Sequence, residues 1–73
     1  MSQNKSILSW FNNKYEKILH GAGSDEYKGA LYANLMTDME SEFKIPMIRD
    51  EAWEKENRAV IALYRKISLS RKF

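Results

Sequence analysis

The sequence predicts an all-α protein, an antiparallel three- to four-helix bundle that forms a single domain over residues 1–73. Apolar residues recur at steps of three and four along three separate segments, which is the spacing of one helix face. No window of four to eight residues alternates strictly between apolar and polar, and no Asn-Gly or Asp-Gly dipeptide marks a hairpin. Short connections join the segments, and they make successive helices antiparallel neighbours.

The first predicted helix covers residues 6–20. Ser6 and Asn4 are its candidate N-caps. Gly21 follows His20 directly, at a position where a left-handed residue often ends a helix. The apolar residues that keep the helical spacing, with a tryptophan at the edge of their stripe, are Ile7, Leu8, Trp10, Phe11, Tyr15, Ile18 and Leu19.

The second predicted helix covers residues 24–44. Ser24 is a favourable N-cap, and two acidic residues follow it in the first turn, where the helix dipole favours negative charge. The helix must end near residue 44, because Pro46 excludes Ile45 from the α region. Its apolar face is formed by Tyr27, Ala30, Leu31, Tyr32, Leu35, Met36, Met39 and Phe43.

A short apolar connector, Ile45-Pro46-Met47-Ile48, follows the second helix. Exposed apolar side chains in a loop are unfavourable, so we expect this connector to plug one end of the bundle. A third helical region then begins at Asp50, a candidate N-cap.

Polar residues interrupt the apolar stripe of this third region, and Asn57 could cap a new start there. We therefore expect two helices, over residues 50–56 and 57–69. Their apolar residues are Trp53, Val60, Ile61, Leu63, Tyr64 and Ile67.

The composition excludes several classes of protein. The chain has 73 residues and no Cys, which rules out disulfides and Cys-based zinc sites. No apolar run approaches the roughly 18 residues of a membrane span. The start of the sequence lacks the apolar core and small-residue cleavage site of a signal peptide, so we expect a cytoplasmic protein.

Residues that carry chemistry are few. His20 stands at a predicted helix C-terminus, where an imidazole is favourable, and we interpret it as structural. Asp38, Glu40 and Glu42 lack the Glu-x-x-His partner of a di-iron bundle, and we interpret them as a solvated helix face. The sequence has no nucleophile elbow and no phosphate loop. We therefore expect no enzyme, no metal and no cofactor.

Charge is ordered along a chain whose net charge is only +2. Residues 1–20 carry three basic and one acidic residue, residues 21–44 two basic and five acidic, and residues 45–73 seven basic and four acidic. The acidic residues of the last part come first and would repel phosphate, so we expect no nucleic acid partner. The basic end has two interpretations, a favourable helix dipole or contact with an anionic surface.

Two further observations concern partners. The Trp10-Phe11 pair beside Lys14 and Lys17 would suit peripheral membrane contact by an amphipathic helix, although the bundle core needs the same stripe and we favour the core. A core this small cannot fully bury every large aromatic side chain, so any that remains exposed is an anchor for a protein interface.

The C-terminal half carries a family resemblance. Residues 32–73 contain Leu35-Met36, Met39-Glu40, Ile45-Pro46-Met47 and the run Ala62-Leu63-Tyr64-Arg65-Lys66-Ile67-Ser68. This segment resembles the small cytosolic immunity proteins for pediocin-like (class IIa, enterocin A type) bacteriocins of Gram-positive lactic acid bacteria and their relatives. The resemblance implies an antiparallel helical bundle without catalytic activity.

The resemblance also implies a function and a site. Such proteins protect the producer cell from the cytoplasmic side, by contact with the membrane permease that the bacteriocin targets. In that family the C-terminal region decides which bacteriocin is recognised. The corresponding partner-binding residues here are Tyr64, Arg65, Lys66, Arg71, Lys72 and Phe73.

One alternative is a small phage-derived or host regulatory protein that binds and inhibits a larger protein. A DNA-binding regulator is a weaker alternative, because the acidic residues precede the basic end.

Overall fold

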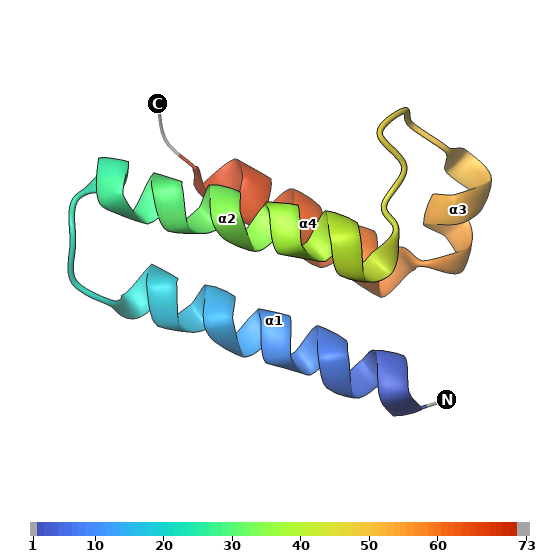
Figure 1. Cartoon of the computed structure of the whole chain (residues 1–73), viewed down its shortest axis with the longest axis horizontal. Coiled ribbons are helices and arrows are strands. Elements are labelled where there is room, and N and C mark those ends of the chain that lie inside the picture. The colour runs from blue at the N-terminus through green and yellow to red at the C-terminus, as the bar shows by residue number, and fades with distance from the viewer. Residues whose placement is uncertain (1, 72–73) are drawn as a thin grey trace.

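Four helices follow one another in the computed structural model, which describes residues 2–71, with side chains from Ser6 onward. They are α1 (Ser2–His20), α2 (Asp25–Phe43), α3 (Glu51–Glu56) and α4 (Arg58–Ser70). Figure 1 shows α1 and α2 as an antiparallel pair, with α4 antiparallel to α2 and α3 at the end of the bundle. No strand occurs in the described residues, and the prediction of an all-α bundle is confirmed.

The core lies where the three long helices meet. Met39 and Ile67 are fully buried, so the second and fourth helices contribute its centre. Both methionines of the predicted α2 stripe pack inside, as unbranched side chains do in irregular cores. The buried hydrophobic residues are Phe11, Tyr15, Tyr32, Leu35, Met36, Met39, Val60, Leu63 and Ile67.

Two predicted N-caps are confirmed. The Oγ of Ser24 accepts a hydrogen bond from the backbone N–H of Tyr27 at 3.1 Å, and Oδ1 of Asp50 accepts one from Trp53 at 3.0 Å. Each cap satisfies a backbone donor that has no partner within the helix.

The predicted start of the first helix is wrong. α1 begins at Ser2, so both candidate caps, Asn4 and Ser6, lie inside the helix. An apolar stripe marks only the part of a helix that packs against a neighbour. Polar residues such as Gln and Lys extend a helix at little cost in free energy, so they leave no signal of where it begins.

The connections after α1 and α2 each contain one residue with a positive φ, and in the first connection it is not the predicted Gly21. Gly23, with φ 134°, is the positive-φ residue of the first connection, whereas Gly21 is not one. A Cβ on Gly21 would lie 2.8 Å from the carbonyl oxygen of Lys17, so this glycine is required by close backbone approach instead. After α2, Lys44 adopts φ 57° and lets Ile45 N–H bond back to the helix.

The predicted break at Asn57 is confirmed, but the role of the side chain is not the expected one. Asn57 makes no side-chain cap for α4. Its Nδ2 donates to the carbonyl oxygen of Trp53 at 2.8 Å, so the amide satisfies the end of α3. The residue therefore closes one helix and does not open the next with its side chain.

The expectation for the connector at residues 45–48 is wrong. Only Ile45 packs against the core, whereas the side chains of Met47 and Ile48 are 102% and 82% exposed. Trp53 from α3 also packs against the core, and it lines the same small recess as Ile45. Pro46 and Ile48 also line this recess, but Ile45 is the residue of the connector that packs against the core.

Within residues 2–71, none of the helices combines the length and apolarity that crossing a bilayer requires.

Candidate interaction surfaces

The predicted partner-binding residues do not form one patch. Tyr64 faces α2, where its hydroxyl donates a hydrogen bond to Oε2 of Glu40. Burial raises the pKa of Tyr64 to about 12, and the neighbouring carboxylate of Glu40 adds to this effect.

The next two residues of α4 face two other helices. Arg65 reaches α3, where its Nη2 lies 2.7 Å from Oε1 of Glu54. The ammonium group of Lys66 lies 5.4 Å from the ring centroid of Tyr15 on α1, within cation–π distance. Three consecutive side chains thus connect α4 to the other three helices.

The remaining predicted residues lie at the C-terminus. Arg71 reaches back to α2, where its Nη1 is 4.0 Å from the sulfur of Met36. Lys72 and Phe73 lie outside the described residues. The four described residues therefore all make contacts within the bundle, and a role in partner binding stays a prediction.

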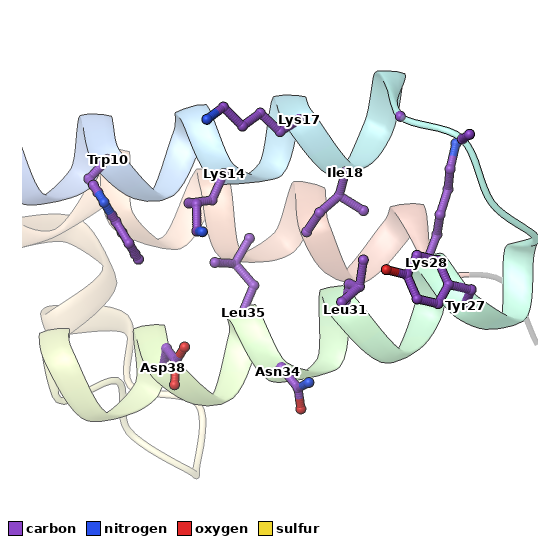
Figure 2. A pocket seen from close by; sticks show the side chains of 12 residues that line it. Trp10, Lys14, Lys17, Ile18, Tyr27, Lys28, Leu31, Asn34, Leu35 and Asp38 are labelled. Atoms are coloured by element: carbon purple, nitrogen blue, oxygen red, sulfur yellow. The ribbon is translucent and has the colours of Figure 1, made fainter.

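A groove runs between α1 and α2 on the side away from α4. Its volume is about 420 Å³, and no residue of α4 lines it. Figure 2 shows Trp10 at one end, Tyr27 at the other, and Ile18, Leu31 and Leu35 between them. The faint ribbon of α4 passes behind these side chains, so the groove opens outward. We call this surface the α1–α2 groove.

The α1–α2 groove carries an excess of positive charge. Lys14 and Lys17 line it from α1 and Lys28 from the start of α2, whereas Asp38 is the acidic residue that lines it. Lys28 donates to the carbonyl oxygen of Leu19 at 3.2 Å, which holds its ammonium group at the end of α1. The groove is therefore apolar at its base and mainly basic at its edges.

Sequence reasoning missed this groove because it assigned two of its residues to the helix stripes. Trp10 and Tyr27 are 52% and 57% exposed. The ring of Tyr27 covers the turn, since a Cβ on Gly23 would lie 2.7 Å from its Cδ2. Trp10 packs edge-on against the buried ring of Phe11, with centroids 5.0 Å apart. A second series at helical spacing, Trp10, Lys14 and Lys17, is the signal that could have indicated the groove.

The groups capable of ligation are scattered. Among the side chains that the structure describes, no three His, Asp or Glu residues lie close enough together to hold a metal ion. His20 is exposed, and its Nε2 lies 3.1 Å from Oε1 of Glu16, one turn earlier on α1.

Comparison of the chain with family models, with curated proteins and with solved structures finds no match.

Proposed function

We propose that this chain is a non-enzymatic immunity protein, which protects a bacteriocin producer by contact with the membrane permease that the bacteriocin targets. The observation that carries the proposal is the resemblance of residues 32–73, in particular the run at residues 62–68. The helical bundle is consistent with it, since a small bundle of this kind presents surfaces for contact. The proposal places the protein in the cytoplasm, on the inner side of the membrane.

The contact surface in this proposal is the exposed side of α4. Arg65 and Lys66 project from it into solvent along part of their length, although each also contacts another helix. Long basic side chains can exchange such exposed contacts for a partner at small cost, because surface ion pairs contribute little free energy. The intramolecular contacts thus position the two side chains without removing them from a partner's reach.

The direct test is expression of the chain in a bacteriocin-sensitive Gram-positive strain, with survival measured against a panel of pediocin-like bacteriocins. We expect protection against at least one of them. The variant Arg65→Ala/Lys66→Ala should lose protection while its helical circular dichroism is kept. Arg49→Ala/Lys55→Ala removes the same charge outside α4 and should still protect. Unchanged survival against every bacteriocin in the panel would refute the proposal.

The α1–α2 groove favours a second candidate function, a small regulatory protein that binds and inhibits a larger protein. In that case the chain gives no protection against any pediocin-like bacteriocin, and its activity depends on the groove and not on Arg65 and Lys66.

A further inference from the structure

We propose that the α1–α2 groove binds an amphipathic helix with an acidic flank, supplied by a partner protein. This inference is independent of the immunity proposal, whose contact surface is the exposed side of α4. The two walls of the groove are formed by α1 and α2, and no residue of α4 lines it.

The shape of the groove fits a helix. Its walls are two antiparallel helices, and on the first side it extends from Trp10 of α1 to Gly21, just after the end of that helix. At about 1.5 Å per residue this is about 16 Å, or three helical turns. On α2 it extends over an equal length, from Tyr27 to Asp38. A helix laid between the two walls would pack as helices do in a four-helix bundle.

The apolar surface in the groove is suited to anchor such a helix. Ile18 and Leu31 are only partly covered, and they lie along the middle of the groove. Trp10 and Tyr27 stand at its two ends with more than half of their surface exposed. Large aromatic side chains at the ends of a partly apolar groove are typical of the residues that dominate protein interfaces.

Charge decides the chemistry of the occupant. Three lysines and one aspartate line the groove, although the whole chain has 12 basic and 10 acidic residues. The α1 wall carries Lys14 and Lys17, and Lys28 of α2 directs its ammonium group to the end of α1, where it donates to the carbonyl oxygen of Leu19. The other polar residues of the α2 wall are Asn34 and Asp38. A bound helix should therefore present Asp or Glu toward α1 and neutral or basic residues toward Asp38.

The ends of the groove also differ in charge, and this difference sets the direction in which a bound helix should run. Lys28 lies beside Tyr27 at one end, whereas Asp38 and Trp10 lie toward the other (Figure 2). The N-terminus of a helix is the positive end of its dipole and is favoured near a carboxylate. The bound helix should begin near Asp38 and run parallel to α1.

Two other occupants suit the groove less well. A second copy of the chain that docks through its own groove would place three lysines and one aspartate against the same residues, so the positive charges would remain largely unpaired. An anionic amphiphile such as a fatty acid has a single head group, whereas the groove has lysines at separate places: Lys14 points toward α2, Lys17 runs along α1 at the outer edge, and Lys28 lies at the Tyr27 end (Figure 2). A row of acidic residues on a helix can pair with all three.

The experiment uses designed peptides of about 14 residues, long enough for the three turns of the groove. One peptide places Leu on one face and Glu on its flank, a second replaces Glu by Lys, and a third scrambles the first. In the full chain with Trp53→Phe, the acidic peptide should shift the emission of Trp10 to the blue and saturate. A quencher on the peptide N-terminus should quench Trp10 more than one on its C-terminus.

Variants with reversed charges test whether the lysines of the groove recognise the acidic peptide. The affinity of each variant for the peptide is measured by the fluorescence anisotropy of labelled peptide. Lys14→Glu/Lys17→Glu should weaken binding of the acidic peptide about tenfold or more and strengthen binding of the Lys peptide. Lys55→Glu/Arg58→Glu changes the charge equally outside the groove and should leave both affinities within about twofold. Gain of binding by the Lys peptide requires a folded variant, so it separates loss of charge contact from loss of fold.

Three outcomes would overturn the proposal. The first is equal affinity for the acidic, Lys and scrambled peptides. The second is equal loss of affinity in the groove variant and its control. The third is a Trp10 shift caused by dodecanoate, or by dimerisation in sedimentation, and not by the acidic peptide. None of these outcomes affects the survival assay, so the two proposals can fail separately.

Discussion

The hydroxyl of Tyr64 donates a hydrogen bond to the carboxylate of Glu40 and so connects α4 to α2 across 24 positions of the chain. The phenol must stay protonated to make this bond. Burial raises its pKa from 10.0 to about 12, and Glu40 adds to the shift because an ionised Tyr64 would be a second negative charge beside the carboxylate.

This relationship predicts a loss of stability in alkali. The folded chain holds the Tyr64 proton more tightly than the unfolded chain, so the contribution is complete below about pH 10 and is lost as the pH rises toward about 12. The free energy of unfolding of wild type should therefore fall more steeply over this range than that of Tyr64→Phe. Burial also raises the pKa of Tyr32, but that residue is present in both proteins and its effect cancels in the difference.

Urea unfolding, monitored by circular dichroism at a series of pH values, measures how steeply the free energy of unfolding falls with pH in each of the two proteins. Parallel slopes for wild type and Tyr64→Phe would contradict the prediction.

A second prediction concerns the hydrogen bond between Tyr15 and Ser70, which are 2.7 Å apart at Oη and Oγ and join α1 to the last residue of α4. Tyr15 is buried, so Ser70→Ala should leave its hydroxyl poorly satisfied and lower the free energy of unfolding by about 1 kcal/mol. Tyr15→Phe in the same background should recover part of the loss. Thermal or urea unfolding of the two single variants and the double variant gives the coupling free energy between the two side chains. Strictly additive losses of stability would show that the hydrogen bond contributes nothing.

A third prediction concerns Gly23, whose φ of 134° is open to glycine and strained for other residues. Gly23→Ala should destabilise the fold by about 1–3 kcal/mol. A new Cβ would also meet the ring of Tyr27, so Gly23→Ala/Tyr27→Ala separates the two causes. If backbone strain dominates, removing the ring does not restore stability in urea unfolding. Recovery in the double variant would assign the cost to the ring.

A fourth prediction is a gain in stability, whereas the first three are losses. Lys44 ends α2 with φ 57°, a left-handed conformation that costs a residue with a Cβ roughly 1 kcal/mol. Lys44→Gly should therefore raise the midpoint of urea unfolding, since glycine adopts this conformation freely. Lys44→Ala removes the same charge but keeps the Cβ, and should give no such gain. Equal midpoints for the two variants would contradict the prediction.

The sequence was sufficient to predict where the helices lie. Every helix boundary falls within one residue of its predicted place except the start of α1, because caps and interrupted stripes leave local signals. Asp50 capped α3 as expected, and the stripe broke at Asn57 as expected. The exception, Ser2, lies in a polar segment whose residues favour no particular boundary.

The candidate surfaces were harder to predict, because spacing does not say which helix lies on which side. Trp10 lies at the edge of the apolar stripe to which its neighbour Phe11 belongs, and only Phe11 is buried, since α2 and α4 meet α1 on that side. Likewise the sequence groups Tyr64, Arg65 and Lys66 in one run, whereas the helix directs them to three different neighbours.

The connector after α2 gives the last prediction, because its apolar residues divide into a packed and an exposed set. Ile45 packs against the core, so Ile45→Ala should lower the free energy of unfolding by about 1–3 kcal/mol. Met47→Ser/Ile48→Ser replaces two exposed side chains and should change it by less than about 0.5 kcal/mol. Urea unfolding of both variants measures the difference. A loss in the double serine variant as large as that of Ile45→Ala would show that the connector does plug the bundle in solution, as its composition alone suggests.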